Sequence, residues 1–263
     1  MKVRNKWVWI TGASSGIGRA LAIEFSRRGA NLVLLARDRA RLQETADACA
    51  QNTKIIIREM DLSVQETMEL VCKSLAEEGV PVDILVNNGG ISQRSLALET
   101  EDFVSRKIFE INFFGTIFLT KLLLPRMIQA GGGQIAVITS LVGKIGSPKR
   151  TTYAASKHAL HGYYDSLRAE LYQDNIRVTL LCPGFIRTNI SYSAVTGDGS
   201  SQNTMDTKTG NGMDPARLAI KAVSGIERER EEVYIGRSEI LAIYLKRWVP
   251  GIFSRILRKV KVT

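Results

Sequence analysis

Cysteine, histidine and long apolar runs are scarce in this sequence of 263 residues. Its three cysteines, Cys49, Cys72 and Cys182, lie far apart and form no C-x-x-C pair, which argues against a disulfide framework and predicts reduced, core-packed thiols. The only histidines are His158 and His161, so we expect structural roles for both and no metal site. No apolar run reaches the ~20 residues needed to span a bilayer, and the N-terminus shows no signal peptide. We therefore expect a cytoplasmic protein.

Negative charge is also in short supply. The formal net charge is +10, and residues 237–263 contribute most of it, with seven basic residues against one acid, Glu239. A nucleic-acid-binding protein usually carries its positive charge over a surface of the fold, whereas here it is concentrated in one terminal segment. No nucleic-acid partner is therefore expected. A composition of 44% hydrophobic and 24% charged residues excludes disordered and collagen-like chains, and we expect one domain over 1–263.

Short apolar, β-branched runs alternate with helical patterns along the chain. This alternation predicts an α/β fold, a doubly wound parallel sheet of seven strands with helices on both faces. The expected strands span 7–10, 31–36, 54–60, 84–86, 134–139, 177–181 and 232–235.

Helix ends and one long loop are marked as well. Residues 63–66 form a capping box, Asp214 and Pro215 begin a later helix, and Gly29 closes the first one. The segment 191–214 is rich in polar residues and has little periodicity, so we expect a long loop that serves as a substrate lid.

A glycine-rich turn follows the first expected strand, with the sequence Thr11-Gly12-Ala13-Ser14-Ser15-Gly16-Ile17-Gly18. Its three glycines allow a tight turn, the approach of backbone N–H groups to a phosphate, and close packing of helix on strand. The turn therefore predicts dinucleotide binding, with a purely structural turn as the alternative. At the end of the second strand, where an acid would bind a free ribose 2′-hydroxyl, stands Arg37, and Arg19 follows the turn. Both favour NADP(H), unless they are solvated surface charges.

Tyr153 and Lys157 lie four residues apart, on one face of an expected helix. A phenol with an ordinary pKa near ~10 is a poor acid or base at neutral pH, and a nearby ammonium lowers that value. The pair therefore predicts a tunable acid–base group, although by itself it fits an exposed surface pair equally well.

The order of these motifs resembles the short-chain dehydrogenase/reductase family. The shared pattern consists of the glycine turn, Asn87-Asn88-Gly89, Asn112, Ser140, the Tyr153–Lys157 pair and Pro183-Gly184. The resemblance covers about residues 7–188 and implies a Rossmann-like fold, a small-molecule carbonyl or alcohol substrate, and hydride transfer with a nicotinamide cofactor. It also implies a homodimer or homotetramer.

The resemblance assigns roles to individual residues. Tyr153 would be the general acid or base, Ser140 would polarise the carbonyl, and Lys157 would hold the nicotinamide ribose and lower the tyrosine pKa. Asn112 would position a water in the proton relay. The implied cofactor site consists of Gly12, Ser14, Ser15, Gly16, Ile17, Gly18, Arg19, Arg37, Asp61, Leu62, Asn88, Gly89, Tyr153, Lys157, Pro183, Gly184, Ile186 and Thr188.

The sequence departs from the family pattern at one motif, and its lid resembles one branch of the family. The family's Asn-Asn-Ala-Gly is here 87–90 with Gly89 in third place, which loses a methyl beside the cofactor but no donor. Lid residues 197–200 and 205–207 resemble a membrane-associated branch of acyl-dihydroxyacetone-phosphate reductase-like enzymes, with hydroxysteroid dehydrogenases more distant. A lipid-like carbonyl is therefore our substrate hypothesis.

In the tail 238–263, apolar and basic residues interleave around Pro250-Gly251, as in helices lying at an anionic membrane surface. Packing on the subunit or in an oligomer interface is the alternative.

Two functions of different class remain. The leading hypothesis is an NADP(H)-dependent oxidoreductase, acting as a carbonyl reductase. The alternative is a catalytically silent dinucleotide-binding regulator or scaffold, because a fold alone does not fix function.

Overall fold

The structure, a computed structural model, describes residues 1–259. Seven parallel strands form a sheet in the order β3-β2-β1-β4-β5-β6-β7. The strands are β1 (Trp7–Thr11), β2 (Asn31–Ala36), β3 (Ile55–Glu59), β4 (Ile84–Asn87), β5 (Gly133–Ile138), β6 (Ile176–Pro183) and β7 (Glu232–Ile235). All seven predicted strands are confirmed, as is the doubly wound α/β fold.

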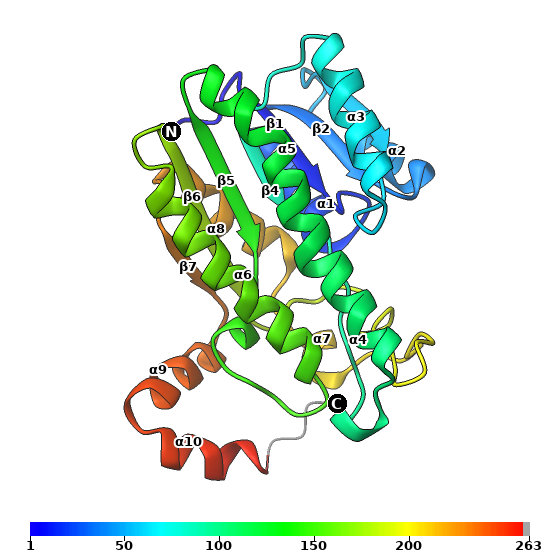
Figure 1. The fold of residues 1–263 in the computed structure, drawn as a ribbon, viewed down its shortest axis with the longest axis vertical. Coiled ribbons are helices and arrows are strands. Elements are labelled where there is room, and N and C mark those ends of the chain that lie inside the picture. The colour runs from blue at the N-terminus through cyan, green and yellow to red at the C-terminus, as the bar shows by residue number, and fades with distance from the viewer. Residues whose placement is uncertain (260–263) are drawn as a thin grey trace.

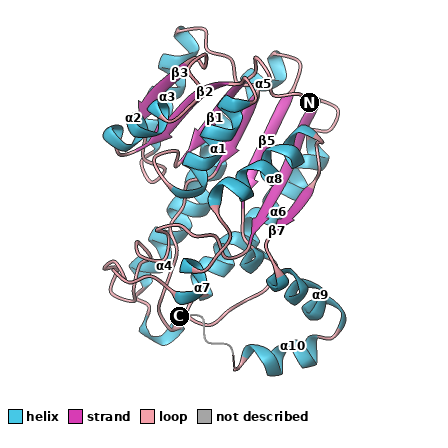
Figure 2. Cartoon of the chain, turned by 180° about the vertical axis from the view of Figure 1, so that it is seen from behind, coloured by secondary structure: helices cyan, strands magenta, loops and turns pink. Residues whose placement is uncertain are grey.

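Helices cover both faces of the sheet (Figure 1). One layer consists of α1 (Gly16–Arg27), α2 (Arg39–Asp47) and α8 (Pro215–Glu227), which lies in front in Figure 2. The other consists of α3 (Gln65–Glu77), α5 (Gly115–Gln129) and α6 (Thr151–Glu170). Successive strand residues point to opposite faces. Trp9 of β1 therefore joins the core beneath α3, α5 and α6, whereas Ile10 joins the core beneath α1 and α8.

A long helical run extends beyond the sheet. It begins with α4 (Asp102–Phe109), continues through a π-helical stretch, Glu110–Phe114, and ends as α5. The sequence has no uninterrupted apolar run of ~20 residues, but the helical run Asp102–Gln129 is long and apolar enough to cross a bilayer by length and composition alone. Part of this run belongs to the core of the fold, since Leu119, Leu123 and Met127 are fully buried against the sheet, whereas Phe103 and Phe114 are about half exposed.

Two helix ends test the expected caps. Asp214 caps α8 through the N–H of Ala216, and Pro215 is its first residue, as predicted. The capping box at 63–66 is wrong. Val64 occupies the cap of α3, because the Ser63 hydroxyl donates instead to a carboxylate oxygen of Asp61, 2.7 Å away.

The segment 191–214 is more ordered than a free loop. Val195 pairs with both Gln93 and Ser201 through isolated β-bridges, and α7 (Thr207–Gly210) forms one helical turn. Asp206, just before α7, is almost fully buried. The predicted lid therefore packs firmly on the body of the protein.

The tail forms two short helices, α9 (Leu241–Trp248) and α10 (Pro250–Leu257), which project beyond the end of the sheet (Figure 1). Lys246 attaches α9 to the body by donating to the carbonyl of Lys144, 2.8 Å away. Residues 260–263 of the predicted tail, with Val260 and Lys261, lie outside the described residues.

All three cysteines are free, as expected. Cys72 and Cys182 are buried as predicted, whereas Cys49 is only partly buried, which the prediction of three core-packed thiols did not anticipate. Burial raises the pKa of both buried thiols to about 12, so they are protonated and unreactive at neutral pH.

Candidate active site

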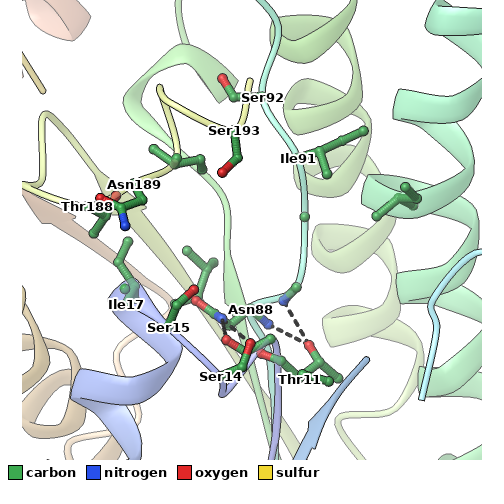
Figure 3. A pocket seen from close by; sticks show the side chains of 18 of the residues that line it. Thr11, Ser14, Ser15, Ile17, Asn88, Ile91, Ser92, Thr188, Asn189 and Ser193 are labelled. Carbon is green, nitrogen blue, oxygen red and sulfur yellow. Dashed lines mark hydrogen bonds between the residues drawn. The ribbon is translucent and has the colours of Figure 1, made fainter. Parts of the chain in front are cut away.

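A cleft of about 1040 Å³ opens at the carboxyl ends of the strands, where the strand order reverses between β1 and β4. This position is the usual ligand site of open α/β sheets. Figure 3 shows Thr11, Ser14 and Asn88 gathered at one part of the cleft, with Ser92 and Ser193 further away. Most of the predicted cofactor residues line it, namely Gly12, Ser14, Ser15, Gly16, Ile17, Arg37, Asp61, Leu62, Asn88, Gly89, Tyr153, Lys157, Pro183, Gly184, Ile186 and Thr188.

The glycine turn has the geometry that an anion site requires. Gly12 has a φ of +64°, a left-handed conformation that favours glycine. A Cβ at Gly18 would lie 2.2 Å from the carbonyl oxygen of Gly12, so only glycine allows this contact between turn and helix. Ser15 caps α1 without a side-chain hydrogen bond from within residues 1–259, which leaves the first N–H groups of the helix for a ligand. A dinucleotide phosphate fits this turn.

Asn88 braces the turn rather than reaching outward. Its side-chain amide donates to the carbonyl oxygens of Thr11 and Gly12, at 2.8 and 3.2 Å (Figure 3). The Thr11 hydroxyl in turn accepts the backbone N–H groups of Asn88 and Gly89, both at 2.9 Å. These bonds tie the ends of β1 and β4 together across the switch point. The expected contact of Asn88 with adenosine stays a prediction.

The space beside Gly89, where the family's alanine would place a methyl group, is occupied in the structure. A Cβ there would lie 2.5 Å from Cδ1 of Leu62, so the leucine side chain occupies the space that an alanine methyl would take. The departure from the family pattern is therefore filled by Leu62, which itself lines the cleft.

Two predicted residues do not line the cleft. Gly18 lies behind the turn in the packing contact described above. Arg19 is exposed, and the cleft-lining residues of this helix end at Ile17, because each further residue turns about 100° around the helix axis. The expected contact of Arg19 with a ribose phosphate stays a prediction.

Arg37 lies at the far end of the cleft, together with Asp38 and Arg41. The Arg37 guanidinium is 72% exposed and lies 3.9 Å from a carboxylate oxygen of Asp61. Asp38 uses its carboxylate to cap α2 through the N–H of Arg41, and it pairs with the Arg41 guanidinium at 3.4 Å. Sequence reasoning missed Arg41, because it is the helical turn of α2 that returns this residue to the cleft.

Ser140, Tyr153 and Lys157 line one part of the cleft together. Ser140 follows β5 by two residues, and its hydroxyl accepts the N–H of Val142, 3.2 Å away, at the start of a turn. The Lys157 Nζ lies 5.9 Å from the centre of the Tyr153 ring and donates to the carbonyl of Ile138, 2.9 Å away. Burial lowers the pKa of Lys157 to about 8.

The pKa of Tyr153 is raised, not lowered as we expected. We expected Lys157 to lower the tyrosine pKa, but burial dominates and raises it. The groups that oppose this rise are the guanidinium of Arg150, a hydrogen bond with Ser140, and the guanidinium of Arg94. Sequence reasoning singled out neither arginine.

Asn112 lies outside the lining of the cleft and is fully buried. Its side-chain oxygen accepts the N–H of Ile91 at 2.8 Å, and its amide donates to the Ile91 carbonyl at 2.9 Å and to Ser156 at 3.2 Å. These bonds join the loop after β4 to α6. The water-positioning role of Asn112 stays a prediction, and its contacts here are those of a positioning residue.

Gln93 is a further residue that sequence reasoning missed. Its fully buried side-chain oxygen accepts the backbone N–H groups of Thr152 and Tyr153, at 2.9 and 3.1 Å. It thereby satisfies the first turn of α6 and fixes the backbone that carries the tyrosine. The contact joins residues 60 apart in the chain, so no local pattern marks it.

His161, Cys182 and Glu232 lie close enough together to be considered as metal ligands. Both oxygens of Glu232 are already engaged, one by the Lys144 ammonium at 2.7 Å and the other by the Tyr234 hydroxyl at 2.6 Å. Burial lowers the pKa of His161 to about 4, which keeps its ring neutral. Nδ1 of His161 lies 3.3 Å from Glu232 but has no hydrogen-bond partner among the described residues, so Glu232 is satisfied by Lys144 and Tyr234 while the imidazole is not.

The cleft, its glycine turn and the strand order define an α/β protein of the dinucleotide-binding class. A family model described as short chain dehydrogenase matches residues 6–198. The chain belongs to the short-chain dehydrogenase/reductase family.

Individual relatives agree with this assignment. Dehydrogenase/reductase SDR family member 7B of Danio rerio is 40% identical and aligns with 97% of this chain and 85% of its own length. Dehydrogenase/reductase SDR family protein 7-like of Drosophila melanogaster is 39% identical, with 98% and 82% covered. A short-chain dehydrogenase from Streptomyces avermitilis has a TM-score of 0.80 at 25% identity over 95% of both chains. The fold alone is shared with a Burkholderia phymatum family member in complex with NAD, at a TM-score of 0.83 and 22% identity, with 100% of this chain and 98% of that one covered.

Proposed function

We propose that the protein is an NADP(H)-dependent reductase that converts a ketone or aldehyde to an alcohol, with Tyr153 as general acid. The observation that carries this proposal is the placement of Tyr153, Ser140 and Lys157 in the same cleft as the glycine turn. A silent dinucleotide-binding scaffold, the alternative, has no need of this juxtaposition.

The chain's own residues would handle the substrate oxygen. The bound nicotinamide supplies hydride, and the protein sets distance and charge. Ser140 donates a hydrogen bond to the carbonyl oxygen, and Tyr153 transfers its phenolic proton to that oxygen as the alcohol forms. Lys157 holds the ribose beside them.

The raised pKa of Tyr153 supports reduction as the favoured direction. Reduction needs the protonated phenol, which is present below the tyrosine pKa and lost as pH rises through it. Oxidation needs the phenolate and gains as pH rises. At neutral pH the raised pKa leaves the proton in place for donation.

The residues around the adenosine end support NADP(H). Arg37 and Arg41 offer two guanidiniums to a ribose phosphate, whereas the carboxylate of Asp38 already caps α2. Phosphate recognition by a guanidinium fork is strong and geometrically specific.

A lipid-like carbonyl is the substrate class that we propose. Ile91, Phe185, Ile190 and Tyr192 line the cleft beside the lid, and such apolar surface suits an acyl or ring system. A panel of carbonyl compounds, followed by loss of NADPH absorbance, tests both reaction and substrate. We expect turnover of acyl or steroid ketones. Activity confined to small hydrophilic ketones contradicts the lipid-like substrate, and no activity on any carbonyl contradicts the reductase.

We further propose that the tail places a cytoplasmic homodimer or homotetramer against a membrane surface. Leu241, Trp248 and Ile252 are 66%, 79% and 51% exposed, and Phe253 is the one buried apolar residue in the described part of the tail. Lys246, Arg247 and Arg255 lie among them. Exposed apolar side chains beside basic ones suit an anionic lipid surface.

Co-sedimentation with liposomes tests the tail. We expect the full chain to pellet with anionic vesicles and less so with zwitterionic ones, and removal of 240–263 to abolish pelleting. A full-length Trp248→Glu variant keeps the Lys246 contact and is expected to lose most of the binding, because it places a charge at the most exposed aromatic ring. Equal pelleting of full-length and truncated protein would rule out the membrane contact.

A further inference from the structure

The lid reaches the neighbourhood of Tyr153 through a buried ion-pair cluster. Asp206 of the lid accepts hydrogen bonds from Nε and Nη2 of Arg94, the first at 2.9 Å. The same carboxylate oxygen lies 3.4 Å from Nη2 of Arg150. The side chains of Arg94, Asp206 and Arg150 are 4%, 0% and 9% exposed. Charges buried to this degree interact strongly with their surroundings.

The cluster carries an excess positive charge on the side of Arg150. Two guanidiniums share one carboxylate, so one unit of positive charge is uncompensated. Arg94 also donates to the Ser92 hydroxyl and to the Gln93 carbonyl. Arg150, by contrast, has a buried Nε without a hydrogen-bond partner among the described residues. Asp206 therefore compensates Arg150 only in part.

Arg150 is held where its charge acts on Tyr153. It occupies the cap position of α6, three residues before the tyrosine, and its guanidinium lies over the ring of Phe185, 5.8 Å from the centre. Both Arg150 and Arg94 line the cleft with Tyr153. Among the groups that oppose the effect of burial on the tyrosine pKa, Arg150 is the largest.

The other polar groups around the phenol come from separate elements. Lys157 projects from the next turn of α6 and donates to the Ile138 carbonyl. Ser140 follows β5 and lines the cleft beside the tyrosine. Arg94 follows β4, and Asp206 belongs to the lid. Asp206 is the one acid in this set, so it is the group whose charge opposes that of the arginines.

We propose that Arg150 is a positioning residue that sets the protonation state of Tyr153, and that the lid carboxylate Asp206 moderates it. The proposal rests on Tyr153 as the acid–base group of the proposed function. Asp206 weakens the field of Arg150, so the phenol keeps its proton for donation. Without this counter-charge the phenolate would form more easily. The carboxylate of Asp206 thereby favours the acid form needed for reduction.

Titration of Tyr153 by tyrosinate ultraviolet absorbance tests the proposal without a substrate. The signal of Tyr153 is the difference between each protein and its own Tyr153→Phe counterpart. We expect Arg150→Gln to raise the midpoint by about one pH unit, and Arg150→Lys to restore most of the change. Asp206→Asn is expected to lower the midpoint, since it removes the opposing negative charge. Arg217→Gln, an equal change of charge at an exposed position of α8, is the matched control and leaves the midpoint unchanged.

The opposite signs separate electrostatics from a loss of structure. Damage to the site would move the midpoint in one direction for both variants, and that result overturns the proposal, as does an unchanged midpoint in folded Arg150→Gln. Circular dichroism across the pH range shows which proteins are folded. If Asp206→Asn does not fold, the comparison of Arg150→Gln with Arg150→Lys decides. If the midpoints shift as expected while Tyr153→Phe retains turnover, the proposed function fails and the electrostatic control of Tyr153 stands.

Discussion

Replacing Tyr153 with phenylalanine is expected to lower kcat at least ~10³-fold, the loss typical of a missing general acid. The ring remains, so its contacts with Val142 and Ala154 in a small buried cluster are kept. What disappears is the hydroxyl that would protonate the substrate oxygen. Binding of NADPH, measured by fluorescence titration, should change by less than about twofold, because the glycine turn and Arg37 are untouched.

Tyr163 supplies the control for this prediction. It lies on the same helix but outside the lining of the cleft, so Tyr163→Phe removes a phenol hydroxyl without removing the acid. We expect its kcat to match that of the unaltered protein. A Tyr153→Phe protein that keeps more than a tenth of normal kcat would show that another group donates the proton. A large loss of NADPH affinity would show instead that the tyrosine acts in cofactor binding.

The parts of the site that the sequence predicts are those carried by short segments. The strand of 7–11, the glycine turn and the start of α1 are contiguous, so their spacing alone indicates the anion site. Tyr153 and Lys157 share a helix face for the same reason. Spacing says less about Arg19. It follows the turn closely in the sequence, and its position around the axis of α1 leaves it exposed, outside the residues that line the cleft.

The parts that could not be predicted depend on contacts between distant segments. Asp206 meets Arg94 across 112 residues and Arg150 across 56, and Gln93 meets Tyr153 across 60. Nothing in the neighbouring sequence marks Gln93, Arg94, Arg150 or Asp206 as different from other polar residues. They become informative only when the fold buries them, because a buried charge must find a partner. The predicted capping box at 63–66 fails for a local reason, because the Ser63 hydroxyl forms its hydrogen bond with the carboxylate of Asp61.

Arg37→Asp is expected to reverse the preference for the phosphorylated cofactor. The variant removes a guanidinium from the ribose end and adds a negative charge there. A hydrogen bond to a charged group contributes about 1.5–3 kcal/mol, which corresponds to a change in affinity of about 10- to 150-fold. We therefore expect the KM for NADPH to rise by about that factor and the KM for NADH to change little or fall. The measurement is the ratio of the two KM values with one carbonyl substrate.

Arg39→Asp is the matched control, because this neighbour pairs with Glu59 at 3.9 Å and does not line the cleft. The same change of charge two residues on should leave the ratio nearly unaltered, and Arg41→Asp should give an intermediate loss of NADPH preference. Equal effects of Arg37→Asp and Arg39→Asp would mean that the general positive field, and not a guanidinium at the ribose, selects the cofactor. If the unaltered protein uses NADH with the lower KM, the assignment of NADP(H) is wrong, and Asp38 becomes the residue that meets the ribose hydroxyls.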